Sequence, residues 1–150
     1  MNPTELNRLF QRDLEKLGTE LSAYLDESKI WIVDKEIANS AGNLAIHLFG
    51  NLRTFIGKDL GNIPYERNRE REFAAKGISR AELLEELGLV KSVVSDSLLD
   101  LEPDQLGEKS IQTFFGYEMT VGYFLVHLYG HFNYHLGQVN YHRRLLGEAE

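Results

Sequence analysis

Cysteine is absent from the 150 residues of this chain. Its absence excludes disulfide scaffolds, cysteine metal sites and thiol nucleophiles. Proline (3 residues) and glycine (13 residues) are too few for a collagenous or low-complexity chain. No apolar run approaches the roughly 18 residues that a membrane-spanning helix needs. The N-terminal residues are charged and amphipathic, unlike a signal peptide, so we expect a cytoplasmic protein.

Basic residues are also in the minority. The chain has 16 Lys and Arg against 23 Asp and Glu, which gives a net charge of −7 at neutral pH. Binding to nucleic acids and to anionic membranes depends largely on Lys and Arg, so we expect neither partner. Hydrophobic residues make up 43% of the sequence, an ordinary value for a globular domain. We therefore expect one domain over residues 1–150.

The N-terminal residues carry the pattern of an amphipathic helix. Asn2 is a candidate N-cap, Pro3 suits the first helical position, and Glu5 completes a capping box. Polar residues 26–29 end the pattern, and Trp31 in the short apolar run that follows is expected in the core. Apolar side chains recur at spacings of three and four, which places them on one helical face: Leu6, Leu9, Phe10, Leu14, Leu17, Leu21 and Leu25.

Three further helices are predicted. The second runs from about Asp34 to Leu60, the third from a capping box at Ser79 to about 101, and the fourth from Thr120 to Leu146. The charged segment 65–79 has no apolar period and is expected to be a surface loop or a frayed extension of the helix, while residues 104–119 are expected to be irregular. Four long helices of similar length predict an all-α, up-and-down-type four-helix bundle, with a long crossover between the second helix and the third.

Histidine is concentrated in the last predicted helix. His127, His131, His135 and His142 lie there, and the fifth, His47, lies in the middle of the second helix. Four residues turn a helix by only about 40°, so imidazoles one turn apart can chelate a metal ion. Both His127/His131 and His131/His135 satisfy this spacing, and His47 is a candidate third ligand from a neighbouring helix. The competing interpretation is that a histidine such as His47 is a hydrogen-bonded core residue and not a ligand. His142, near the helix end, is expected on the surface.

Polar side chains accompany these histidines. Asn43 and Asn51 lie one turn on each side of His47, which indicates either a polar cleft or a solvent-facing stripe. Gln138 lies on nearly the same face as His135 and is a candidate to orient an imidazole or a bound water.

Two motifs resemble those of a known family. The segment His131-Phe-Asn-Tyr-His135-Leu-Gly137-Gln138 resembles the H-x-x-x-H-x-G-Q signature of the DinB-like superfamily, and the segment around His47 resembles that family's first metal histidine. Members are small four-helix-bundle metalloproteins that include bacillithiol-dependent and mycothiol-dependent thiol transferases. Helix order extends the resemblance over the whole chain. Leu136 departs from the arginine that many relatives have in this motif.

The resemblance implies a ligand set and a cofactor. It implies that His47, His131 and His135 bind a divalent transition metal, zinc or nickel, and that His127 is not a ligand. With three protein ligands, at least one metal position stays open, as in catalytic sites.

The resemblance also implies a function. We expect a metal-dependent transferase that activates a low-molecular-weight thiol for reaction with a small-molecule substrate, in a chain that forms a homodimer. The alternatives are a metal-dependent hydrolase and a non-catalytic, stress-linked metal-binding protein. No carboxylate is evident beside the two motifs to serve as a proton shuttle, which counts against the hydrolase. Arginines in the segment 67–71 either receive a carboxylate of the thiol or belong to a solvated loop of mixed charge.

Overall fold

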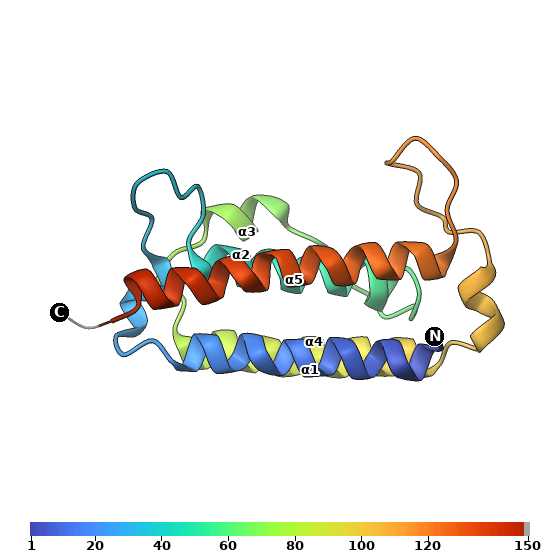
Figure 1. Cartoon of the computed structure of the whole chain (residues 1–150), viewed down its shortest axis with the longest axis horizontal. Helices are drawn as coiled ribbons and strands as arrows, with labels where there is room; N and C mark the ends of the chain where they lie inside the picture. The colour runs from blue at the N-terminus through green and yellow to red at the C-terminus, as the bar shows by residue number, and fades with distance from the viewer. Residues whose placement is uncertain (149–150) are drawn as a thin grey trace.

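A computed structural model describes residues 1–148 as a bundle of helices (Figure 1). No β-strand occurs within these residues, so the prediction of an all-α fold is confirmed. Short 3₁₀ segments lie at residues 27–31 and 103–107, and a π-helical segment lies at residues 53–58. The α-helices are α1 (Pro3–Ser22), α2 (Ala41–Leu52), α3 (Arg69–Ala74), α4 (Arg80–Leu99) and α5 (Val121–Leu146).

α1 begins as its sequence predicts. The side-chain oxygen of Asn2 accepts a hydrogen bond from the backbone N–H of Glu5, and the Glu5 carboxylate accepts one from the backbone N–H of Asn2, both at 2.9 Å. These two bonds satisfy donors that the first helical turn leaves free. The helix ends at Ser22, so the predicted stripe does not extend to Leu25, whose side chain is exposed.

α2 begins later than its sequence predicts. Residues 34–40, predicted as the first turns of the helix, form a loop in which Lys35 has a left-handed φ of 54°. The hydroxyl of Ser40 caps the helix by accepting a hydrogen bond from the N–H of Asn43 at 3.1 Å. All 12 residues of α2 are buried. The π-helical segment continues to Lys58, close to the predicted end at Leu60.

The segment 65–79, predicted as a surface loop, contains α3. The side chain of Asn68 caps this helix by accepting a hydrogen bond from the N–H of Arg71 at 3.0 Å. α3 packs against α2, and the side chain of Glu72 is buried at 2% exposure. The sequence did not reveal α3, because the buried side chain of this short helix is the charged Glu72 and not an apolar residue. The segment therefore shows no apolar period.

The caps of α4 and α5 follow the predictions. Ser79 and Glu82 form the expected capping box at the start of α4. The hydroxyl of Thr120 accepts a hydrogen bond from the N–H of Tyr123 at 3.1 Å, and Gly147 caps the C-terminal end of α5.

The long helices form a bundle in which α4 and α5 each contact both α1 and α2 (Figure 1). α1 and α5 run in one direction, while α2 and α4 run in the other. The long helices α2 and α4 follow one another in the bundle and are parallel, so the chain must cross back along the bundle between them. The connection between α2 and α4, which includes α3, makes this predicted crossover.

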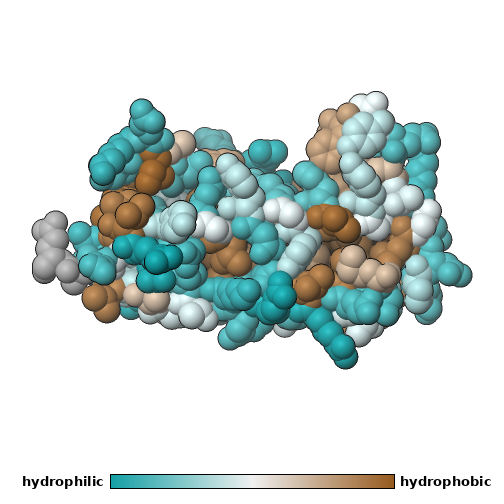
Figure 2. All heavy atoms as spheres, viewed as in Figure 1, coloured by the Kyte–Doolittle hydropathy of each residue, from teal (hydrophilic) through white to brown (hydrophobic). Residues whose placement is uncertain are grey.

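The core takes buried side chains from α1, α2, α4 and α5. Ile30 is fully buried there, and Trp31 is half-buried with its indole N–H donating to the carbonyl of Ile78 at 3.1 Å. The visible surface is mainly hydrophilic, with separate hydrophobic patches (Figure 2). Within residues 1–148, no helix combines the length and the apolar character needed to cross a membrane.

Candidate metal centre

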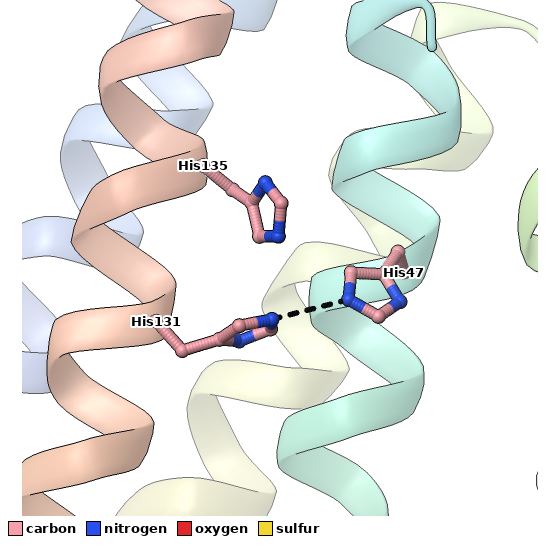
Figure 3. A group of neighbouring side chains, drawn as sticks. All are labelled: His47, His131 and His135. Carbon is pink, nitrogen blue, oxygen red and sulfur yellow. Dashed lines mark hydrogen bonds between the residues drawn. The ribbon is translucent and has the colours of Figure 1, made fainter. Parts of the chain in front are cut away.

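Three histidines from two helices converge in the bundle. His47 lies on α2, His131 and His135 lie one turn apart on α5, and the rings point toward one another across the space between the helices (Figure 3). Each ring offers one nitrogen, and these nitrogens all lie within 4.8 Å of one another. The Nε2 atoms of His47 and His131 are 3.3 Å apart. The structure therefore brings together the three histidines that the family motifs indicate.

One pair of these nitrogens has the spacing of two ligands of a transition metal ion. Two ligands of a tetrahedral zinc ion, each about 2.0–2.1 Å from the metal, lie about 3.3–3.4 Å from each other. The observed distance between Nε2 of His47 and Nε2 of His131 has this value. Burial and the neighbouring histidines lower the pKa of His131 to about 4, so its ring is neutral and available as a ligand at neutral pH.

A carboxylate orients His47. The Nδ1 atom of His47 lies 3.0 Å from Oε1 of Glu72. Because an ionised carboxylate only accepts hydrogen bonds, Nδ1 carries the proton and donates it. The lone pair of the ring then lies on Nε2, the atom that faces His131. This is the carboxylate–histidine arrangement found behind many metal ligands.

Glu72 is itself held by an arginine. Nε and Nη2 of Arg67 donate to the two carboxylate oxygens of Glu72, each at 2.8 Å. Although burial favours the protonated form, the hydrogen bonds from His47 and Arg67 hold the pKa of the Glu72 carboxyl below its usual range. The carboxylate is therefore ionised at neutral pH, and its charge is balanced by Arg67.

Close packing of α3 on α2 places this carboxylate. A Cβ atom at Gly50 would lie 2.2 Å from Oε2 of Glu72, so only glycine leaves room for the carboxylate. The side-chain amide of Asn43 donates to the backbone carbonyls of Glu72 and Ala75 at 3.1 and 2.8 Å. Asn43, predicted to support the site, therefore does so by anchoring α3 and not by contacting an imidazole.

Gln138 orients the third histidine, as the sequence suggests. Its side-chain oxygen lies 2.7 Å from Nδ1 of His135 and accepts a hydrogen bond from it, which leaves the lone pair on Nε2. Burial lowers the pKa of His135, while the hydrogen bond with Gln138 opposes this shift. His47 and His135 thus each have their distal nitrogen free for a metal ion.

Asn51 and His127 lie outside the cluster. Asn51 is 8% exposed, and within residues 1–148 its side-chain oxygen accepts no hydrogen bond. The exposed ring of His127 packs against Phe115 and Phe124, at centroid distances of 4.6 and 5.8 Å. Of the two histidine pairs that the sequence leaves open, the structure places His131 and His135 with His47.

Comparison with known proteins identifies a family. Residues 5–150 match the family described as "Protein of unknown function (DUF1572)". The chain belongs to the DUF1572 family. It has no match among curated proteins or among solved structures. The family description assigns no activity to this DUF1572 protein.

Two pockets flank the histidine cluster of the DUF1572 protein. One, of 480 Å³, reaches His135 and Gln138 and is bordered by Glu36, Ile37 and Tyr141. The other, of 330 Å³, reaches His47 and His131 from the opposite side. The cluster is therefore accessible from both pockets.

His142 differs from its sequence interpretation. The ring is buried, with Nε2 2.8 Å from the carbonyl oxygen of Ile32 and Nδ1 2.7 Å from the hydroxyl of Tyr24. The carbonyl can only accept, so Nε2 carries the proton and Nδ1 accepts from the tyrosine. Burial lowers the pKa of His142, and the ring is a neutral core residue, not a surface cation.

Nothing in the sequence indicated that Glu72 belongs to the site, and Arg67 was expected as a partner for a cosubstrate carboxylate or as a solvated side chain, not as the partner of Glu72. Both lie in the charged segment where acids and arginines alternate, and nothing local distinguishes Glu72 from its exposed neighbour Glu70. Asn68 is a residue type that commonly caps helices, and it does cap α3. Its presence could have predicted a helix here, with one face packed against the bundle.

Proposed function

We propose that this protein is a DinB-like metalloprotein that binds a divalent transition metal, zinc or nickel, through His47, His131 and His135. The observation that carries the proposal is the convergence of three imidazoles, two of which are oriented by Glu72 and Gln138. Imidazole nitrogens suit both metals. Three protein ligands leave at least one metal position open, which is typical of catalytic sites.

We further propose that the protein is a transferase that uses a low-molecular-weight thiol. A divalent ion at the cluster would supply the Lewis acidity that lowers the pKa of a bound thiol. The chain has no cysteine of its own, so the thiol must come from a cosubstrate. Pockets on both sides of the cluster support this proposal, because a transferase needs space for two reactants.

The structure gives less support to a hydrolase. Glu72 is the carboxylate that sequence reasoning did not find beside the histidines, and a hydrolase would need such a group as a proton shuttle. However, both oxygens of Glu72 are occupied by Arg67, and one of them also accepts from His47. Its lowered pKa also makes it a poor proton donor. Glu72 is therefore a positioning residue.

Metal analysis of single variants tests the ligand assignment. His131→Ala and His135→Ala should each remove most of the bound metal, because two imidazoles make a weak site. His127→Ala is the matched control from the same helix and should retain it. Full metal retention in His135→Ala would contradict the assignment.

Titration of the cobalt-substituted protein with biological thiols tests the thiol proposal. A sulfur-to-cobalt charge-transfer absorption should grow with added thiol and be absent in His135→Ala. If no thiol produces this absorption at millimolar concentrations, direct thiol activation is wrong and the metal site has another role.

We also propose a homodimer. Tyr123, Tyr134 and Tyr141 lie exposed along α5, and the apolar Val126 is exposed on the same helix. Spacings of three, seven and eight residues place these side chains on one helical face, which a second copy of the chain could cover.

A further inference from the structure

The smaller pocket beside the histidine cluster combines features that point to a ligand. We name it the arginine pocket, because Arg67 and Arg69 line it together with Asn51, three phenylalanines and the cluster residues His47 and His131. It lies between α2 and α5, and residues that follow α2 and precede α5 also line it.

The apolar wall of the arginine pocket consists of aromatic rings. Phe55, Phe114 and Phe124 pack against one another with centroid distances of 5.4–5.8 Å. Their planes are inclined at 56–86°. Inclined rings at these distances present edges and faces to a third ring, which is the arrangement that aromatic side chains favour.

The charge of the arginine pocket is positive. Arg67 is neutralised by its paired hydrogen bonds to Glu72. Arg69 forms no ion pair with a carboxylate within residues 1–148, so its charge remains available to a ligand. A guanidinium at the edge of a pocket in a chain of net charge −7 favours an anion, and its planar fork matches a carboxylate.

Asn51 supplies an unpaired polar group. Its side chain is more than nine-tenths buried, lines the arginine pocket, and has an oxygen without a hydrogen-bond partner within residues 1–148. A buried amide without a partner costs free energy, which a polar atom of a ligand would recover. A carboxylate only accepts hydrogen bonds, so it would pair with the NH₂ group of Asn51, which rotation of the amide can exchange with the oxygen.

We propose that the arginine pocket binds a small carboxylic acid with an aromatic body. Its carboxylate lies at Arg69 and Asn51, and its ring lies among the three phenylalanines. Binding of such an acid does not depend on a metal. Its role as the second reactant, held next to His47 and His131, rests on the function proposed above.

Calorimetric titration with benzoate and with benzamide, its neutral analogue, tests this site. Both probes are titrated into chelator-treated protein and into zinc-loaded protein. Benzoate should bind at least about tenfold more tightly than benzamide, because hydrogen bonds to a charged group are the stronger ones. Arg69→Gln should weaken benzoate binding about tenfold and leave benzamide binding unchanged. Asn51→Leu, which is similar in size, should weaken binding of both probes.

Arg71→Gln is the matched control, because Arg71 lies two residues away and faces Glu86 instead of the pocket. Arg69 is exposed, so its substitution leaves the core intact. Equal affinity for benzoate and benzamide, or benzoate binding that Arg69→Gln leaves unchanged, would overturn the proposal. Benzoate binding that requires zinc and is unchanged in Arg69→Gln would also overturn the proposal, because the carboxylate would then bind only to the metal. The chelated protein tests the pocket even if the histidines bind no metal.

Discussion

Glu72 is the side chain on which the orientation of His47 depends. Glu72→Gln keeps the size of the group and removes the charge that fixes the proton on Nδ1. We expect zinc affinity, measured by competition with a chromophoric chelator, to fall about 10-fold to 100-fold. Glu70→Gln, on the exposed side of the same helix, should leave it unchanged. Equal zinc affinity in both variants would show that His47 binds without this support.

His142 makes the free energy of unfolding depend on pH. Burial lowers the pKa of this neutral ring in the folded protein. As the pH falls below about 6.5, the His142 ring therefore takes up a proton in the unfolded chain before it does so in the folded protein. The free energy of unfolding that this ring contributes above that pH is lost progressively below it. His142→Gln should reduce the slope of unfolding free energy against pH between about pH 5 and 7, measured by urea denaturation. If the slope of unfolding free energy against pH is the same in His142→Gln and in the wild type, the pH dependence comes from other groups.

The residues of the histidine cluster could be predicted from sequence, but the groups that orient them only in part. His131, His135 and Gln138 lie on one helix, so spacing alone fixes their relative positions. Placing His47 opposite them required only that two mid-helix positions face each other. Glu72 reaches His47 from a separate helix, and no local pattern encodes that contact.

The start of helix α2 depends on Ser40, which is its N-cap residue. Its hydroxyl accepts from the N–H of Asn43 and donates to the side-chain oxygen of Asn43 at 2.6 Å, and Asn43 in turn anchors α3. Ser40→Ala should lower the free energy of unfolding by about 1–2 kcal/mol, measured by urea denaturation. Ser92→Ala on the exposed side of α4 is the control and should change it much less. A similar loss in both variants would deny Ser40 a special role.

The difference between predicted and observed helix ends has a physical cause. The caps at Asn2, Ser79 and Thr120 were predictable, because the first two belong to capping boxes and the third precedes an apolar run. Ser40 lacks an acidic partner three residues on, and the preceding residues 34–39 carry no glycine or proline that would mark a loop. The helix start was therefore placed too early, although the middle of α2, with His47, was placed correctly.

At the scale of the whole molecule, a metal at the cluster would link α2 to α5. A ligand that binds only the folded state stabilises it by about 2.7 kcal/mol at a concentration 100 times its dissociation constant. We therefore expect zinc to raise the melting temperature of the wild type and a chelator to reverse the shift, as measured by calorimetry. His127→Ala should show the same shift as the wild type, and His135→Ala should show little. A shift that persists in His135→Ala would place the zinc elsewhere.

The proposed dimer is also a property of the whole molecule. Sedimentation should give about twice the 17.2 kDa mass of one chain. Tyr134→Glu places a charge in the middle of the exposed face of α5 and should yield monomers. Leu99→Glu, also at an exposed position, at the end of α4, is the control and should remain dimeric. A wild-type mass of one chain would rule out a stable dimer.

The helix that closes the bundle also completes the cluster, and this has a consequence for biosynthesis. His47 and His131 are 84 residues apart, and α5, which carries two of the three imidazoles, leaves the ribosome after α1–α4. A nascent chain without α5 lacks part of the core and most of the proposed ligand set. An ion can therefore be captured at this cluster only after translation has passed α5. Metal bound at the proposed site would then mark chains in which α5 has already packed against α2.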